Sequence, residues 1–190
     1  MSATFDVLVP GYVREDTDGT EHVRGTVSLI RSADLVMVAD PGIMESQVVL
    51  IDCLGAHGLS LTDVTHVFVS HHHLDHTRNI GMFPNAAVID SDSIYSGDVW
   101  GEHDGDGYEI AEGVSIMLTP GHSAECASLI VETDDKGTVV YTHAWWLSDM
   151  TPVADPMAEN QRELEASRVK ILAIADVIIP AHGEPFEAPK

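Results

Sequence analysis

Residues 70–76 carry the residue types most able to do chemistry in this chain, in the order Ser-His-His-His-Leu-Asp-His. This run directly follows the apolar residues 67–69, which predicts that it lies at the end of a β-strand. Imidazole nitrogens and carboxylate oxygens are the usual ligands of zinc and related metals. In a strand His71 and His73 point to the same side, and the Asp-His pair after them can turn toward a second point nearby. The spacing therefore favours two adjacent metal positions over one closed structural site.

The pattern H-x-H-x-D-H is the hallmark of the metallo-β-lactamase fold hydrolases, and the chain resembles this family in three further places. Asp40 ends an apolar run, as the family's early aspartate does. His122, within Thr-Pro-Gly-His-Ser, resembles the third histidine, and His182, within Pro-Ala-His-Gly, resembles the last. The resemblance extends over residues 38–183. It implies an α/β fold, a four-layer αββα sandwich, with residues 1–190 forming a single domain.

The resemblance also implies which side chains hold the metal. They form two groups of three, namely His71, His73 and His122 at one position, and Asp75, His76 and His182 at the other. Asp40 is expected behind them, where it would accept a ring N–H from one of the ligands. Zinc is the expected cofactor, as one or two ions, and the same ligand types also accept iron, manganese or cobalt.

One position departs from the family pattern. The family carries an aspartate after a strand between the third and last histidines, and this carboxylate bridges two metals. Here the apolar run 138–141 is followed by Thr142 and His143. A neutral imidazole offers one lone pair to one metal, so it cannot bridge as a carboxylate does. We therefore expect His143 to complete one metal position, with a second ion held more weakly or only one ion bound.

Hydrolysis is the reaction that this ligand set implies. In relatives that do redox chemistry at two irons, the second histidine of the pattern tends to be acidic, whereas here it is His73. Metal-bound water loses a proton near neutral pH, and the resulting hydroxide would attack a small ester, lactone, thioester or lactam. Asp75 is the expected catalytic residue, because it can orient this hydroxide and receive a proton.

Two alternative functions remain open. Residues 79–84 and 177–186 resemble metallo-β-lactamase domain-containing protein 1 and its microbial relatives, whose animal member is associated with nuclease activity on RNA. This resemblance suggests a phosphodiesterase or ribonuclease. In the other alternative His143 closes an open coordination site, and the chain is a metal-binding protein with little catalysis, because structural metal sites are saturated by protein ligands.

The chain is strongly acidic, with 31 Asp and Glu against 9 Lys and Arg and a formal net charge of −22. This charge disfavours long nucleic acid as a partner, because affinity there depends on Lys and Arg meeting phosphates. Halophilic proteins carry acidic, Lys-poor surfaces of this kind, and a merely acidic mesophilic protein is the alternative. No run approaches the ~18–20 apolar residues of a membrane span, and residues 1–6 lack the features of a signal peptide. We therefore expect a cytoplasmic protein that acts on a small molecule, with a homodimer as a possible assembly.

Short apolar runs separated by Gly, Asp and Asn predict strands. These runs are residues 5–9, 26–30, 35–39, 66–69, 86–89, 114–118, 128–131, 138–141 and 177–180. Helical spacing of apolar residues predicts helices over 45–57 and 159–175. Residues 90–106 are rich in Ser, Gly and Asp and predict a long loop, either a solvated connector or a flap whose aromatic side chains contact substrate. Trp145 and Trp146 follow His143 directly and predict either a pocket wall or core packing.

Salt should stabilise the protein if the net charge of −22 is a halophilic adaptation. Ions screen the self-repulsion of the folded chain, so we expect the midpoint of thermal unfolding to rise from low salt to multimolar potassium chloride. Differential scanning calorimetry over this range measures the effect. An unchanged or falling midpoint would reject the halophile hypothesis.

Overall fold

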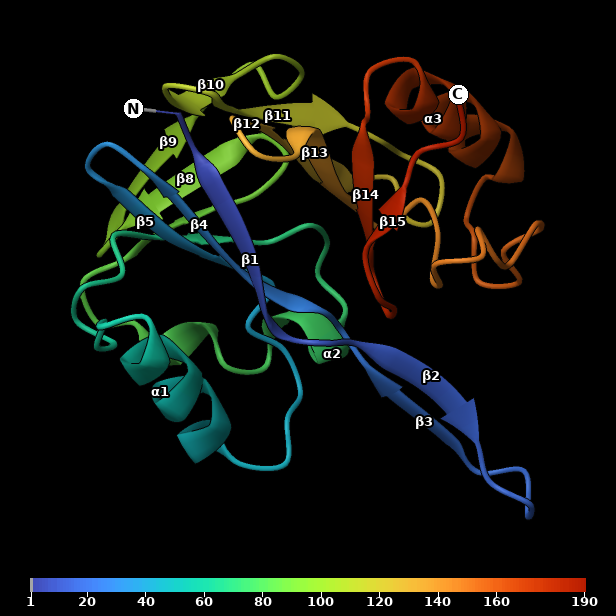
Figure 1. Ribbon diagram of the computed structural model, residues 1–190, viewed down its shortest axis with the longest axis horizontal. Coiled ribbons are helices and arrows are strands. Elements are labelled where there is room, and N and C mark those ends of the chain that lie inside the picture. The colour runs from blue at the N-terminus through green and yellow to red at the C-terminus, as the bar shows by residue number, and fades with distance from the viewer. Residues whose placement is uncertain (1) are drawn as a thin grey trace.

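The computed structural model describes residues 2–190, which form two facing β-sheets and a separate hairpin (Figure 1). The first sheet has the strand order β1 (Thr4–Val9), β4 (Val27–Ser32), β5 (Leu35–Ala39), β6 (His66–Phe68), β7 (Ala87–Ile89), β8 (Ser93–Ser96) and β9 (Val99–Glu102). The second sheet has the order β10 (Glu109–Ala111), β11 (Val114–Leu118), β12 (Ala127–Thr133), β13 (Gly137–Thr142), β14 (Val177–Pro180) and β15 (Phe186–Glu187). The hairpin consists of β2 (Tyr12–Glu15) and β3 (Glu21–Arg24).

Side chains alternate along the strands between the two faces of each sheet. In β4, Ile30 belongs to the core between the two sheets, whereas its neighbour Leu29 belongs to the core under a helix. In β5, Met37 and Ala39 face the space between the sheets, and Val38 faces the helix side. This period of two is expected of strands that are covered on both faces.

One helix covers the outer face of each sheet. Leu50 and Leu54 of α1 (Gln47–Ala56) are fully buried against the first sheet. Leu164 and Ile171 of α3 (Gln161–Leu172) are fully buried against the second. The layers are therefore helix, sheet, sheet and helix, which confirms the predicted αββα sandwich (Figure 1). No helix in the part of the chain that the structure describes is long and apolar enough to cross a membrane.

The predicted elements agree with the structure best at the apolar strands. The predictions for 35–39, 114–118 and 177–180 have the bounds of β5, β11 and β14. Both helices are shorter than predicted. They begin after Ser46 and Asn160, whose side chains accept hydrogen bonds from backbone N–H groups of the first turn.

The prediction of a long loop over residues 90–106 was wrong. This segment contains β8 and β9, which form an antiparallel hairpin at the edge of the first sheet. Pairing of β8 with β7 supplies hydrogen-bond partners that composition does not reveal, so tertiary context overrides the local preference of Ser and Gly. The short strands β2, β3, β10 and β15, the helical turn α2 (Leu74–Thr77) and the 3₁₀ turn Ile80–Met82 were not predicted either.

Parallel strand pairs gather the candidate site residues at one end of the sandwich. β5 runs parallel to β6, and β13 runs parallel to β14. Asp40 directly follows β5, the histidine run follows β6, His143 directly follows β13, and His182 lies two residues after β14. In sheets of this kind functional sites lie at the carboxyl ends of parallel strands, and the fold places these residues there.

Gly121 allows the loop before β12 to approach α3 closely. Its φ is +142°, and a Cβ added there would lie 2.3 Å from the backbone N and Cα of Leu164. Gly121→Ala should therefore lower the free energy of unfolding by about 1–3 kcal/mol, since neither backbone can yield cheaply. Urea titration measures the loss.

Gly55→Ala in α1 is the matched control, because a Cβ there meets no heavy atom within 4 Å in residues 2–190 outside its own helix. Removing a helical glycine should raise stability by about 0.5–1 kcal/mol. Equal stability of the two variants would contradict the close approach of the loop to α3.

Candidate metal centre

Two groups of buried imidazoles lie at this end of the sandwich. Within each group the candidate ligand atoms lie within 4.8 Å of one another. The groups are His71, His122 and His143, and His76, His143 and His182. Each group contains two of the three residues expected at one metal position, and His143 belongs to both groups.

The remaining candidate ligands lie beside these groups. Nδ1 of His73 is 3.2 Å from Nε2 of His122. A carboxylate oxygen of Asp75 is 3.3 Å from Nε2 of His76 and 3.9 Å from Nε2 of His182. The structure therefore brings all seven candidate ligands together.

His72, between two of these residues in sequence, points elsewhere. Its side chain is 57% exposed, with Nε2 3.3 Å from a carboxylate oxygen of Asp90 and Nδ1 3.6 Å from one of Glu125. This orientation is expected for a residue between two others that point to the same side of an extended segment.

Outer hydrogen bonds set the orientation of two imidazoles in the cluster. Nδ1 of His122 lies 2.8 Å from a carboxylate oxygen of Asp155, and Nδ1 of His182 lies 3.0 Å from the carbonyl oxygen of Arg24. Both partners can only accept, so Nδ1 of each ring carries the proton. Nε2 of each ring is left with a lone pair that faces the cluster, as metal coordination requires.

Asp40 is the outer hydrogen-bond acceptor that orients the imidazole of His76. It is fully buried, and one of its oxygens lies 2.7 Å from Nδ1 of His76 and accepts hydrogen bonds from the hydroxyls of Ser70 (2.6 Å) and Tyr141 (2.7 Å). The other oxygen accepts from the Ser70 backbone N–H at 2.8 Å. Since the Ser70 hydroxyl donates to Asp40, its oxygen can accept from Nδ1 of His71, 3.1 Å away. Asp40 thus orients two imidazoles, one directly and one through Ser70.

Burial keeps most of the imidazoles neutral, the form that binds metal. Burial and the neighbouring imidazoles hold the pKa of His71 and of His143 far below the usual range. The same causes lower the pKa of His182 to about 4. Neutral rings packed this closely direct several lone pairs into the same space, and a metal cation there would attract them.

The two carboxylates beside His76, Asp40 and Asp75, shift its pKa in the opposite direction. Burial alone would lower the pKa of His76, but the charge and hydrogen bond of Asp40 outweigh it and raise the pKa to about 9. Burial would raise the pKa of Asp75, but the nearby ring of His76, 3.3 Å away, and the charge of His182 outweigh it and lower the pKa to about 2. Asp75 is therefore a carboxylate at neutral pH, available as a ligand.

Three ring nitrogens in the cluster are buried without a hydrogen-bond partner in residues 2–190, namely Nε2 of His71, Nε2 of His76 and Nδ1 of His143. A buried polar atom left without a partner costs about 1–3 kcal/mol. Three such atoms in one cluster, beside a carboxylate, are the expected arrangement of metal ligands. The residues present therefore fit a metal, and the cluster is capable of binding one.

A cavity of about 460 Å³ opens over the cluster. Its floor is formed by candidate ligands, and its walls come from the β2–β3 hairpin and the segment after β13. The lining residues are Val13, Glu21, His22, Val23, His73, Asp75, His122, His143, Trp146, Pro156, Met157 and His182. Both hypotheses for the tryptophan pair hold in part, because Trp146 lines the cavity and Trp145 is 2% exposed within the core.

Several residues around this cavity were not predicted from the sequence. Asp155 lies outside any motif, and its partner His122 is 33 residues away. Val13 and Val23 belong to the β2–β3 hairpin, whose strands were not predicted from the sequence. The aromatic residues of 90–106, Tyr95 and Trp100, do not line the cavity, so they are not the flap considered from composition.

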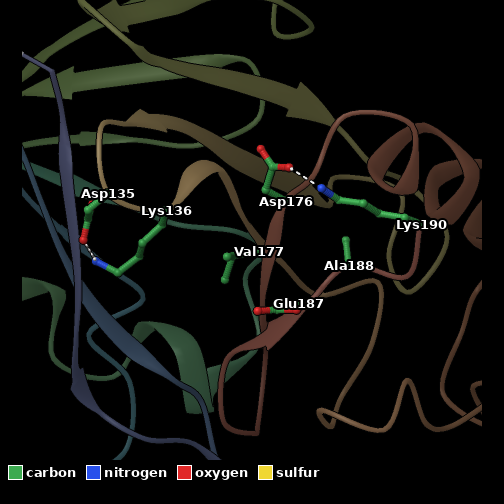
Figure 2. A pocket seen from close by; sticks show the side chains of 7 residues that line it. All are labelled: Asp135, Lys136, Asp176, Val177, Glu187, Ala188 and Lys190. Atoms are coloured by element: carbon green, nitrogen blue, oxygen red, sulfur yellow. Dashed lines mark ion pairs between the residues drawn. The ribbon is translucent and has the colours of Figure 1, made fainter.

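Another cavity, of about 610 Å³, lies between the β12–β13 turn and the C-terminal residues (Figure 2). Four of its five charged side chains are paired, Lys136 with Asp135 and Lys190 with Asp176, at 3.0 and 3.6 Å, and the fifth is Glu187. Neither group of buried imidazoles borders it. The histidine cluster therefore remains the candidate site.

The sequence profile described as "Metallo-beta-lactamase superfamily" matches residues 21–183, a range that includes all the candidate ligands. The chain belongs to this superfamily. Metallo-beta-lactamase domain-containing protein 1 of Xenopus laevis is 34% identical to this superfamily member over 194 residues, covering 97% of this chain and 81% of that protein. Matches to mammalian proteins of the same name cover 55–59% of their length.

Solved structures show the same fold. A putative metallo-beta-lactamase from Thermotoga maritima has a TM-score of 0.70 at 20% identity, with 98% of this chain and 100% of that chain covered. An N-acyl homoserine lactone hydrolase with its product N-hexanoyl-L-homoserine at the catalytic metal centre has a TM-score of 0.67 at 18% identity, with 96% and 93% covered. Homologues in this superfamily are metallo-hydrolases, and the chain is assigned to this class of enzyme. One is an N-acyl homoserine lactonase of Bacillus thuringiensis, which is 29% identical over 139 residues, covering 65% of this chain and 55% of that protein.

His143 should make the two metal positions unequal. Its Nε2 lies 3.3 Å from Nε2 of His182, and its ring stacks on that of His122 at 4.0 Å, but a neutral ring gives one lone pair to one ion. Calorimetric titration of metal-free protein should therefore show one tight and one weaker zinc step, or a single step. His143→Asp should strengthen the weaker step, because a carboxylate can span two ions and adds a negative charge.

His72→Asp is the matched control, since His72 lies between two candidate ligands in the sequence and its side chain points away from the cluster. It should leave both steps unchanged. Two equally tight ions in the unmodified protein would show that another group bridges them.

Proposed function

We propose that this protein hydrolyses a small ester, lactone, thioester or lactam with the help of one or two zinc ions. The ions would be held by the seven converging side chains, which are His71, His73, Asp75, His76, His122, His143 and His182. The observation that carries the proposal is that five of these side chains line the floor of a cavity with partly apolar walls, namely His73, Asp75, His122, His143 and His182. This combination is typical of sites that bind and transform small molecules.

The charge of the cavity favours an uncharged substrate over a phosphodiester. Among its lining residues, all within the described chain, none is Lys or Arg, and Glu21 adds a carboxylate to the walls. The net charge of −22 also repels a polyanion. Recognition of a nucleic acid depends on Lys and Arg contacts to phosphates, so the ribonuclease alternative has less support.

The donor set favours zinc. It combines six imidazoles with one carboxylate, and neither cysteine of the chain belongs to the two ligand groups. Imidazole and carboxylate suit zinc well, and also suit iron and manganese in other geometries. AidC, a dizinc lactonase of the same fold, supports the same choice.

When bound, the ions would supply an acidified water as nucleophile and polarise the oxygen under attack. The chain's own residues would orient the reactants. Asp75, whose side chain is 15% exposed, can accept a hydrogen bond from the water and hold it toward the substrate. Asp40 and Asp155 would keep the ligand imidazoles in the required tautomer, and Trp146 and Met157 would exclude bulk water from the apolar side of the cavity.

A substrate panel tests this proposal. Protein purified without added metal is first analysed for metal content, and is then assayed on N-acyl lactones, aryl esters, thioesters, a lactam, and an aryl phosphodiester as the alternative substrate. We expect turnover of at least one carbonyl substrate that a chelator abolishes and zinc restores. Asp75→Asn should reduce this turnover by about 100-fold or more.

Asp98→Asn, in the exposed turn between β8 and β9, is the control and should leave turnover unchanged. Turnover of the phosphodiester alone would support the nuclease alternative. Tight metal binding without turnover of any member of the panel would support the alternative of a metal-binding protein with little catalysis.

A further inference from the structure

Two loops around the metal cluster are joined by a series of hydrogen bonds. The backbone N–H groups of Glu159 and Asn160 donate to the carbonyl oxygens of His122 (3.1 Å) and Gly121 (2.9 Å). In the reverse direction, the Ala124 N–H donates to the Glu159 carboxylate at 2.9 Å. The segment between β13 and α3 therefore lies directly against the loop that presents His122.

Asp155 connects these two loops through its side chain, which is 1% exposed. One oxygen lies 2.8 Å from Nδ1 of His122 and accepts a hydrogen bond from the Trp146 indole N–H at 3.1 Å. The other oxygen accepts from the Met157 backbone N–H at 2.8 Å. His122 is a candidate metal ligand, while Trp146 and Met157 line the cavity. One buried carboxylate thus contacts both the metal cluster and the wall of the cavity.

We propose that Asp155 is a positioning residue that couples metal binding at His122 to the order of the Trp146 wall. A cation on Nε2 of His122 withdraws electrons from the ring and strengthens donation from Nδ1–H to the carboxylate. The stronger hydrogen bond restrains the Asp155 carboxylate. The carboxylate in turn restrains the Trp146 indole, whose N–H donates to it. The inference rests on the metal site of the proposed function and is independent of the substrate.

The rest of the segment is anchored separately. The Arg168 guanidinium, on α3, donates to the carbonyl oxygens of Ala144 (2.8 Å), Pro152 (2.8 Å) and Val153 (2.6 Å). Because these bonds do not involve the carboxylate of Asp155, neutralising that carboxylate should loosen Trp146 and His122 while the segment stays folded.

Zinc titration followed by tryptophan fluorescence tests the coupling without an activity assay. In the unmodified protein zinc should change the emission, and Trp146→Phe should remove most of this change while keeping zinc affinity close to that of the parent. Asp155→Asn should weaken zinc binding by about 10–100-fold and lose most of the change even at saturation. Asp149→Asn, an exposed carboxylate of the same segment that bonds Thr151, is the matched control and should behave as the parent.

The outcomes separate this inference from the proposed function. A parent protein that binds no zinc would refute the metal site itself. A parent that binds zinc while Asp155→Asn keeps the same affinity and the same emission change would refute the coupling alone. A full zinc-dependent change in Trp146→Phe would also refute it, because the signal would then come from another tryptophan. Circular dichroism of metal-free Asp155→Asn shows whether the variant is folded; Trp146→Phe tests the same link if it is not.

Discussion

In His76, His122 and His182, one ring nitrogen faces the cluster while the other is hydrogen-bonded to an acceptor outside it. A buried ring nitrogen without a partner costs about 1–3 kcal/mol, so the outer acceptors decide whether the cluster can exist. The fold supplies them from three different places. Asp40 follows β5, Asp155 lies in the segment before α3, and the Arg24 carbonyl ends β3. Parallel strands deliver the ligands, and these acceptors orient them.

The replacement of a carboxylate by His143 changes the electrostatics of this centre. A neutral ring contributes no negative charge, so bound cations would keep more of their positive charge than in a site with a bridging aspartate. A bound water would be correspondingly more acidic. Since no Lys or Arg lines the cavity among the described residues, such cations would be the source of positive charge facing a substrate.

Sequence reasoning located the fold and the candidate ligands because their signals are local. The histidine run, the apolar strands before Asp40 and His182, and the positions after them are all visible within a few residues. Asp155 and Tyr141 could not be assigned, because each acts on a residue 33 or 101 positions away through a contact that only the packed sheets create. The edge hairpin β8–β9 was missed for a related reason, since its pairing with β7 outweighs a composition rich in Ser, Gly and Asp.

The central claim is that the histidine cluster binds a metal ion. X-ray absorption spectroscopy tests this claim most directly, at the edge of whichever metal is found in protein purified without added metal. The account predicts a first shell of nitrogen and oxygen near ~2.0–2.2 Å, with the outer-shell scattering of several imidazoles. Loss of imidazole scattering in His71→Ala would assign this shell to the cluster. A sulfur shell near ~2.3 Å, or metal whose spectrum His71→Ala leaves unchanged, would contradict the account.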